Sequence, residues 1–260
     1  IFLMNKDGSN KKQLTKTPFS NYYPFISPDG TKILFMSLPK EKTVITTISI
    51  DGSNLKFLTD ENKENADPHW SPDGSKIVFN THRDGNNEIY LMDSDGTNPK
   101  RLTHHSASDQ SPVISPDGKH IMFVSNRDGN PELYLMDIHG YNLRRLTFDP
   151  RSDRVPGWSP DSKKIIWYSR ESSKVAGSGG KSWNGAEIYE MNVDGTSRKQ
   201  LTQNLFREQG PVYSPDGKWI ASGSNDGIVI FFGQFFCSQR NFKCAGNFYN
   251  INIFIFFCMF

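Results

Sequence analysis

The repetitive part of this sequence contains no cysteine, and the chain as a whole has almost no net charge. All three cysteines lie near the C-terminus, at Cys237, Cys244 and Cys258, without the spacing of metal ligands. They indicate no site, and their absence elsewhere fits either side of a membrane. Lys and Arg number 30 against 28 Asp and Glu, so the charge balance gives no reason to expect a nucleic-acid partner.

Long apolar runs, helical periodicity and a hydrolase motif are also missing. The apolar run from Ile251 to Phe260 is shorter than the roughly 20 residues that a membrane-spanning helix needs. No stretch has a convincing helical period, so we expect no important helices. No Gly-x-Ser-x-Gly motif occurs, and the nucleophile turn of a serine hydrolase is therefore not present.

What the sequence does contain is a repeat with three markers in register. Ser-Pro-Asp-Gly, once as Ser-Pro-Asp-Ser, recurs at intervals of 44, 44, 44 and 55 residues, at Ser27, Ser71, Ser115, Ser159 and Ser214. Leu-Thr keeps the same steps, at Leu14, Leu58, Leu102, Leu146 and Leu201. A third turn follows them, at Asp7, Asp51, Asp95, His139 and Asp194. A period in the low forties with strand-like content is typical of propeller blades.

One repeat, from Asp67 to Thr103, predicts four short strands. Pro-Asp-Gly is a turn, because Pro presets φ, Asp accepts local hydrogen bonds and Gly takes a positive φ. Strands are predicted before this turn, at 76–81, at 88–93 and at 100–103. A single such sheet cannot bury both faces and must stack on its neighbours. Large residues stand before each Ser-Pro, and we expect two of them, Trp70 and Trp158, to be buried between blades.

The motifs are specific enough to indicate a family. Pro-x-aromatic-Ser-Pro-Asp-Gly and Lys-Ile-x-Phe are followed by Asn126–Asp137 and then by Arg144–Thr147. Over residues 1 to about 228, this pattern resembles the WD-repeat-like blades of the TolB type. The resemblance implies an all-β β-propeller of four-stranded antiparallel blades, with six blades in the parent. It says little about function, because related blades occur in prolyl-oligopeptidase-like enzymes and tricorn-like proteases.

The markers divide residues 1–228 into four complete blades and two half-blades. Complete blades are predicted at 16–59, 60–103, 104–147 and 148–202, with half-blades at 1–15 and 203–228. We expect the two half-blades to be able to combine as a fifth blade, which would hide the sheet edges. The chain opens inside a blade, so we expect its N-terminus, with any signal peptide, to be missing.

Residues 229–260 form a Phe- and Cys-rich tail in which the repeat is lost. Residues 228–260 contain ten Phe and no Asp or Glu. Three interpretations stay open: an out-of-frame or non-coding translation joined to a propeller, a diverged native last blade, and the start of a membrane segment. We expect residues 233–260 to pack poorly. The eleven additional residues of the longest repeat lie between Ser169 and Glu187 and predict an extended hairpin loop.

Candidate metal and cofactor motifs are incomplete. Metal-binding oligogalacturonate lyases, a related propeller family, use histidines from several blades, whereas His69 is the only histidine among its five equivalent positions. The other histidines lie beside turns or in a loop between blades. Asp93–Gly96 lacks the downstream ligands of a calcium loop. Gly177–Ser182 lacks the first glycine and the strand-loop-helix setting of a phosphate loop. No metal or cofactor is predicted.

A polar residue stands six positions before each repeat serine. These ring residues are Asn21, Asn65, Asp109, Asp153 and Glu208. Equal register in stacked blades would place them around one channel mouth, as an accessible rim for a partner's basic or amide groups. The competing interpretation is that they cap local turns. Arg83-Asp84 and Arg127-Asp128 are expected at exposed hairpin corners or in local ion pairs.

We therefore expect a non-enzymatic scaffold that binds a protein or peptide partner at a channel mouth. The TolB resemblance implies a periplasmic, cell-envelope location. The alternative is the substrate-gating propeller of a prolyl-oligopeptidase-like serine peptidase whose hydrolase domain is absent from this chain. The sequence beyond residue 228 would separate the two, because only the peptidase needs a Gly-x-Ser-x-Gly domain there.

Overall fold

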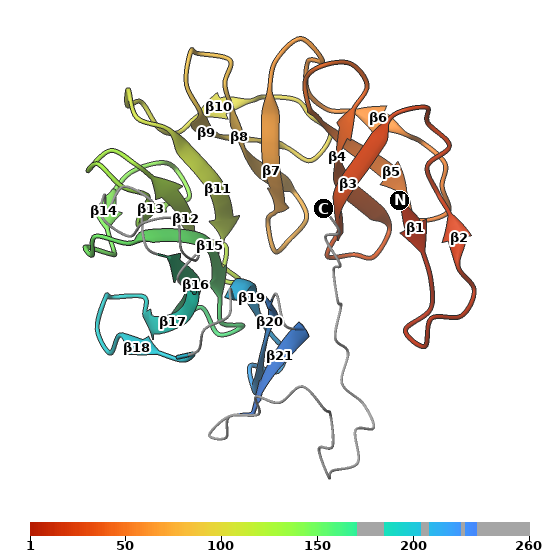
Figure 1. The fold of residues 1–260 in the computed structure, drawn as a ribbon. Helices are drawn as coiled ribbons and strands as arrows, with labels where there is room; N and C mark the ends of the chain where they lie inside the picture. Colours follow the sequence, from red (N-terminus) through yellow and green to blue (C-terminus); the bar gives the residue numbers. More distant parts are fainter. Residues whose placement is uncertain (171–184, 204–207, 225–226, 233–260) are drawn as a thin grey trace, which may run out of the picture.

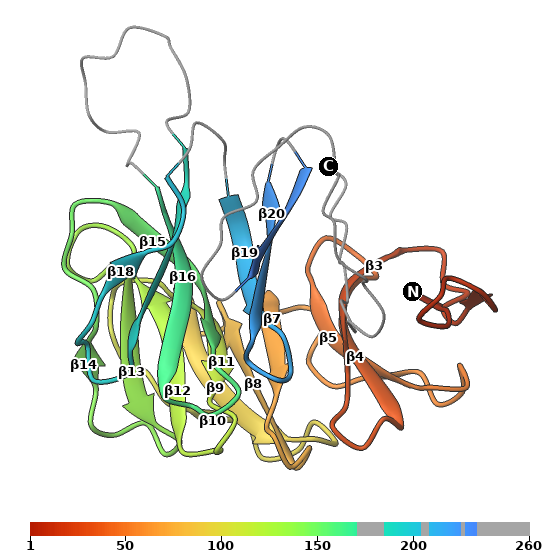
Figure 2. The same cartoon turned by 90° about the horizontal axis from the view of Figure 1, so that it is seen from below.

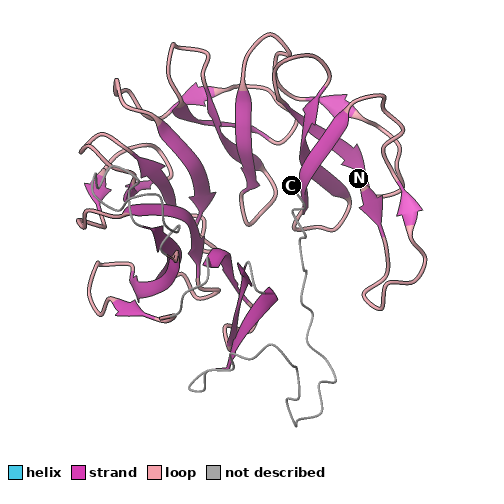
Figure 3. Ribbon diagram, viewed as in Figure 1, coloured by secondary structure: helices cyan, strands magenta, loops and turns pink. Residues whose placement is uncertain are grey.

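The computed structural model describes residues 1–170, 185–203, 208–224 and 227–232, and that part of the chain consists of strands and turns without a helix (Figure 3). No helix there is long and apolar enough to cross a membrane. The extended hairpin loop and the packing of residues 233–260 fall outside the described residues.

Four successive sheets each contain four antiparallel strands in sequence order. Blade 1 contains β3 (Ser20–Ile26), β4 (Lys32–Leu38), β5 (Val44–Ser49) and β6 (Lys56–Phe57). Blade 2 contains β7 (Asn65–Trp70), β8 (Lys76–Thr81), β9 (Glu88–Asp93) and β10 (Lys100–Arg101). Blade 3 contains β11 (Asp109–Ile114), β12 (His120–Ser125), β13 (Glu132–Asp137) and β14 (Arg144–Arg145). Blade 4 contains β15 (Ser152–Trp158), β16 (Lys164–Arg170), β17 (Glu187–Asn192) and β18 (Lys199–Gln200). The blades follow one another around an arc, with the first strand of each innermost (Figure 1).

Two smaller sheets lie at the ends of the arc. A hairpin of β1 (Phe2–Leu3) and β2 (Lys12–Gln13) precedes blade 1. After blade 4, β19 (Glu208–Tyr213), β20 (Trp219–Ser224) and β21 (Gly227–Phe232) form a three-stranded sheet, which we call blade 5. Strand β21 therefore crosses position 228, where the sequence predicts the end of the repeats.

The expected fifth blade made from both ends is not formed by the described residues. The two end sheets are separate, and they lie apart in both views (Figure 1, Figure 2). The physical reason is that β21 pairs with β20 from Trp219↔Phe232 to Ser224↔Gly227. It already occupies the edge of β20 that β1 would need.

The Ser-Pro-Asp-Gly turn closes the first hairpin of each blade in the predicted way. In blade 2, the Ser71 hydroxyl donates to Asp73 Oδ1 at 2.6 Å and accepts from the Lys76 amide at 2.8 Å. Gly74 has φ +71°, a left-handed conformation that favours glycine. Hydrogen bonds from Ser71 and Ser75 lower the pKa of Asp73 to about 2. The turn is thus fixed by contacts within one motif.

The core lies between neighbouring blades, as predicted for the two tryptophans. Trp70 is 6% exposed and Trp158 is 8% exposed. Each indole Nε1 donates to a carbonyl of the preceding blade, Trp70 to Phe25 at 3.3 Å and Trp158 to Val113 at 3.2 Å. Ile26 occupies the same register in blade 1 but is 44% exposed, because only the β1–β2 hairpin precedes it.

A second recurring joint lies at the outer edge, and we call it the basic latch. In four places, a basic side chain on the last strand of one sheet donates to a backbone carbonyl in a turn of the next blade. The Nζ–O distances are 2.7 Å for Lys12–Asp51, 2.8 Å for Lys56–Asp95 and 3.4 Å for Lys100–His139. Arg144 makes the same connection to Val193 at 2.7 Å.

The innermost strand of every blade is bulged at one position. Pairing with the second strand shifts there, and the residue has a positive φ. The bulged residues are Tyr23, Asp67, Ser111, Val155 and Gly210. Equivalent positions touch around the axis, since the Ser111 hydroxyl lies 3.1 Å from Asp67 Oδ2, and the Phe25 and His69 ring centroids are 5.8 Å apart. At Asp67 and Ser111, the bulged residues of neighbouring blades are thus in direct contact.

Candidate functional site

One face of the propeller is formed by two sets of loops, and we call it the loop face. It comprises the loops that lead into the innermost strands (58–64, 102–108, 146–151) and the loops between second and third strands (82–87, 126–131). Asn86 Nδ2 donates to the carbonyls of Ala107 at 2.6 Å and His105 at 2.8 Å. Asn130 repeats this contact with Arg151 and Asp149. Each amide thus clamps a loop of its own blade to the start of the next blade.

The five ring residues lie at one register on this face. Each pairs with a Ser or Thr at the end of the neighbouring second strand, as Asn21↔Ser37, Asn65↔Thr81, Asp109↔Ser125, Asp153↔Ser169 and Glu208↔Ser224. The regular spacing in the sequence therefore becomes a regular arrangement in space. The side chain of Glu208 is outside what the structure describes.

The expectation that the ring residues remain accessible is wrong for three of them. Asn65, Asp109 and Asp153 are 0% exposed, and Asn21 is half-buried. The loops fold over the side chains instead of leaving them on a rim. Asn65 Nδ2, for example, lies 2.6 Å from the Lys63 carbonyl, and Asn21 Nδ2 lies 2.6 Å from the Thr17 hydroxyl. These two residues cap loops.

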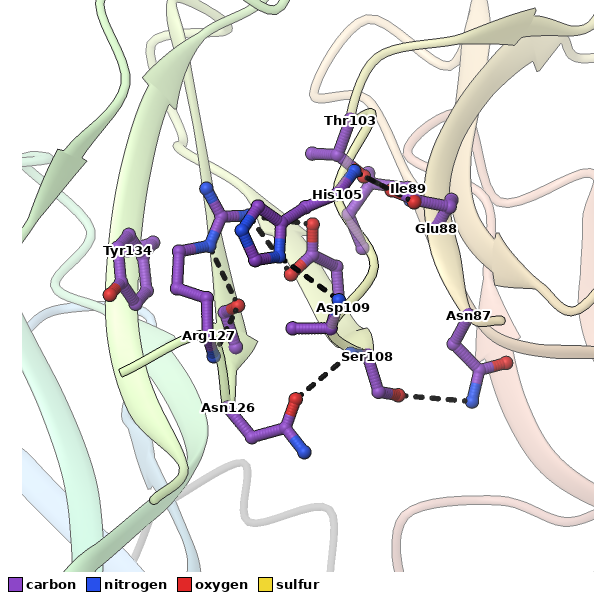
Figure 4. Close-up of polar contacts among 12 residues, drawn as sticks. Asn87, Glu88, Ile89, Thr103, His105, Ser108, Asp109, Asn126, Arg127 and Tyr134 are labelled. Atoms are coloured by element: carbon purple, nitrogen blue, oxygen red, sulfur yellow. Dashed lines mark hydrogen bonds and ion pairs between the residues drawn. The ribbon is translucent and has the colours of Figure 1, made fainter. Parts of the chain in front are cut away.

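Asp109 belongs to a buried ion pair (Figure 4). Arg127 Nη2 lies 3.0 Å and 2.8 Å from its two carboxylate oxygens, and Arg127 Nε donates to Ser125 Oγ at 2.9 Å. The guanidinium also lies 4.7 Å from the Tyr134 ring centroid. Burial raises the pKa of Asp109, while Ser125 and the Arg127 charge oppose the rise. Of the two expectations for Arg127, the structure shows the ion pair and not the exposed corner, because its side chain is only 14% exposed.

Blade 2 contains the same arrangement with an amide in place of the carboxylate. Arg83 Nη2 lies 3.4 Å from Asn65 Oδ1, and Arg83 Nε lies 3.3 Å from Thr81 Oγ1. Its guanidinium stands 4.6 Å from the Tyr90 ring centroid. The signal for this contact is an Arg 18 residues after the ring residue, which occurs in repeats 2 and 3 and which sequence reasoning missed.

Blade 4 has the carboxylate without the arginine. Glu171 stands at the position equivalent to Arg127. Among the residues that the structure describes, neither oxygen of Asp153 has a hydrogen-bond partner, and the Ser169 hydroxyl and Trp167 Nε1 also have none. Burial raises the pKa of Asp153 to about 6; the nearby Ser169 hydroxyl opposes this rise, and the Asp149 carboxylate adds to it. Buried polar groups are normally paired, so this cluster requires an explanation.

A second layer of carboxylates supports the loop face from within the blades. Glu88 and Glu132 are 0% exposed. Arg145 Nη2 lies 3.0 Å from Glu132 Oε1, and the Thr147 hydroxyl donates to the other oxygen. Arg101 and Thr103 hold Glu88 in the same way. Both carboxylates are therefore occupied by hydrogen bonds within the protein.

The described residues contain no group of three or more potential ligands positioned to hold a metal ion. His69 lies beside the axis, where its Nδ1 is 2.9 Å from the Trp70 carbonyl and burial lowers its pKa. Away from the ring, a cavity of about 360 Å³ lies between Arg144–Asp149 and Asp194–Arg198. Its arginines are engaged, Arg198 with Asp149 and Arg144 with backbone carbonyls.

A family model described as the TolB beta propeller domain matches residues 1–178. No curated protein sequence is a significant match. Among solved structures, TolB from Acinetobacter baumannii is 26% identical and has a TM-score of 0.71. That match covers 89% of this chain and 56% of the other, so this chain spans little more than half the length of that protein.

Two further structures show the same fold. The putative TolB from Agrobacterium tumefaciens is 22% identical, with a TM-score of 0.69, and the match covers 88% of this chain and 89% of that one. Oligogalacturonate lyase from Vibrio parahaemolyticus is 14% identical, with a TM-score of 0.69, and the match covers 92% and 69%. The predicted family and the predicted fold are confirmed.

Proposed function

Because the chain belongs to the TolB beta propeller domain family, we propose that it is a non-enzymatic scaffold that binds a protein or peptide partner. The partner is bound at the loop face and reaches the inner strands behind it. The loops of this face are held by buried amides and ion pairs, so they present a preformed surface, which lowers the entropic cost of binding. The TolB likeness supports a cell-envelope, periplasmic location as part of the proposal.

The observation that carries the proposal is the exposed apolar character of the inner strands. Tyr23 is 49% exposed, Phe25 37%, Val155 43% and Val212 53%. All four lie on first strands, at the bulged position or two residues after it. Apolar side chains that are exposed at the same place in several blades suit an interaction surface. A partner segment that passes the loop face would cover this surface.

A peptide selection tests the proposal. The protein is immobilised and a random peptide library is selected on it. The selected peptides should bind V155E/V212E at least tenfold more weakly. They should bind Y141E/L143E unchanged, since these residues are equally apolar and exposed but lie on the outer hairpin of blade 3. The protein should also release no product from a prolyl p-nitroanilide substrate. Three results would contradict the proposal. The selected peptides could lose affinity only for Y141E/L143E, the protein could hydrolyse the substrate, or the selection could yield no peptide at all.

A further inference from the structure

The joint between blades 3 and 4 contains the cavity of about 360 Å³ described above, and we call it the joint cavity. One of its walls is the loop 146–151, which belongs to the loop face. Its volume falls within the range of about 300–1,000 Å³ that is usual for ligand-binding cavities. A smaller cavity of about 220 Å³ lies at the equivalent joint between blades 1 and 2, where Asp60 and Pro99 are among the lining residues.

Two residues in the wall of the joint cavity differ from their counterparts in the repeat. Phe148 is 71% exposed, and the side chain of Arg198 is 34% exposed. At the three preceding joints, the equivalent pairs are Lys16 and Leu55, Asp60 and Pro99, and His104 and Leu143. The combination of an exposed benzyl ring and a guanidinium is therefore specific to the joint between blades 3 and 4.

The guanidinium of Arg198 is held flat against the blade. It lies 4.8 Å from the ring centroid of Tyr189 and 5.5 Å from that of Trp167. These two rings are stacked on each other, with centroids 5.6 Å apart. The carboxylate of Asp149 pairs with Arg198 Nη2. One flat face of the guanidinium is thus covered by rings of blade 4, and because Arg198 also lines the joint cavity, a molecule in the cavity meets the opposite face.

The charges around the joint cavity favour a neutral ring over a free anion. Arg198 is paired with Asp149, Arg145 is paired with Glu132, and Arg144 donates to backbone carbonyls. An aromatic ring needs no uncompensated charge, because the face of a ring attracts a cation through its quadrupole. A guanidinium that is bound through one nitrogen can still stack on a ring with its planar face.

We propose that the joint cavity binds an aromatic side chain of the partner, which stacks on the open face of Arg198 and contacts Phe148. This inference rests on the proposed function and specifies what the partner must carry. Among the aromatic side chains, we expect tryptophan to bind best, because an indole ring makes the strongest contacts with cations. A partner bound at the loop face can reach the cavity, since the loop 146–151 belongs to both.

A small probe tests the joint cavity without the partner. N-acetyl-tryptophan amide is titrated into the isotope-labelled protein and followed by NMR, and saturable shifts are expected. N-acetyl-cyclohexylalanine amide, which is bulky and apolar but has no π system, should bind about tenfold more weakly. Arg198→Leu should weaken binding of the tryptophan probe by about tenfold as well. This variant should fold, because blades 1 and 3 have Leu55 and Leu143 at the same position.

Two further variants separate the guanidinium from its surroundings. Asp149→Asn removes the ion pair but keeps the cation, so affinity for the tryptophan probe should not fall. Leu143→Ala changes the position equivalent to Arg198 at the preceding joint, and it should leave binding of the probe unchanged. Melting temperatures of all three variants show whether each one is folded.

Three results would overturn the proposal: equal binding of the two probes, tryptophan-probe binding that survives in folded Arg198→Leu, or a loss of binding in Leu143→Ala as large as in Arg198→Leu. The peptide selection described above separates this inference from the proposed function. Selected peptides that bind Arg198→Leu as tightly as the unchanged protein would refute the aromatic site alone. Binding of the tryptophan probe without any selected peptide would refute the proposed function alone.

Discussion

The buried pair of Asp109 and Arg127 gives the most direct test of how the loop face is built. Asp109→Ala removes the carboxylate and leaves the guanidinium without its charge partner. Breaking a buried ion pair from one side costs roughly 3–5 kcal/mol. Arg127 keeps its 2.9 Å bond to Ser125 and is 14% exposed, so it stays partly hydrated. We therefore expect a loss near the lower end, about 3 kcal/mol.

Blade 2 supplies the matched control for this change. It has Asn65 where blade 3 has Asp109, and Arg83 still lies 3.4 Å from the amide oxygen. Asp109→Asn should reproduce that arrangement and exchange the ion pair for a hydrogen bond from the charged guanidinium to a neutral amide oxygen, at a cost of about 1 kcal/mol. A second control, Glu61→Gln, breaks an exposed ion pair with Lys40 and should cost below about 1 kcal/mol.

Urea denaturation followed by tryptophan fluorescence measures all three changes. The expected order of destabilisation is Asp109→Ala, then Asp109→Asn, then Glu61→Gln. If Asp109→Ala stays within about 0.5 kcal/mol of the unchanged protein, the range of an ordinary surface substitution, the ion pair does not hold the loop face. If Asp109→Asn costs as much as Asp109→Ala, the blade 2 arrangement is not transferable and the comparison between blades fails.

Four further predictions follow from single features. Burial raises the pKa of Asp153 in the folded protein to about 6 from the ordinary 3.8, so folding favours its protonated form. The free energy of unfolding should therefore fall by up to about 3 kcal/mol as pH rises from about 4 to about 6. Asp153→Asn should remove this pH dependence in equilibrium unfolding experiments. Trp158→Ala should cost roughly 3–5 kcal/mol, and Ile26→Ala, at the same register but exposed, below about 1 kcal/mol in the same assay. Val155→Asn should stabilise by about 1 kcal/mol, because asparagine tolerates the left-handed backbone there; a loss of stability would show that the valine side chain is needed. If the partner is basic, its affinity measured by calorimetry should fall as salt rises, and salt-independent binding would exclude an electrostatic contribution.

The blades could be predicted from the sequence because their signals are local. The turn at Ser71–Gly74 is fixed by contacts within a few residues, and the same residues recur in each repeat. The burial of Trp70 and Trp158 followed from a fixed register, since stacked copies of one sheet must bury the same position. Ile26 departs from the rule because its position needs a neighbouring blade, which the repeat pattern alone does not supply.

The ring could be predicted in register but not in environment. The spacing of six residues before each serine predicts only that the ring residues share one register. In the structure, Asn65, Asp109 and Asp153 each pair with an equivalent second-strand residue. Their burial depends on the path of the loops and on an arginine 18 residues away, in a different hairpin. The sequence alone does not distinguish an acidic residue that is exposed to water from one that pairs with a guanidinium group.

The basic latch has a consequence for how such a chain can grow. Blades 1 to 3 each carry a donor on the fourth strand and an acceptor carbonyl in the turn before that strand, so each of these units matches a copy of itself at both ends. Lys56 reaches Asp95 across 39 residues, and Lys12 and Lys100 reach their carbonyls across the same separation. A gene duplication that inserts one whole 44-residue unit therefore creates two new joints whose parts already fit. Blade number can change by tandem duplication without any compensating substitution at the joint.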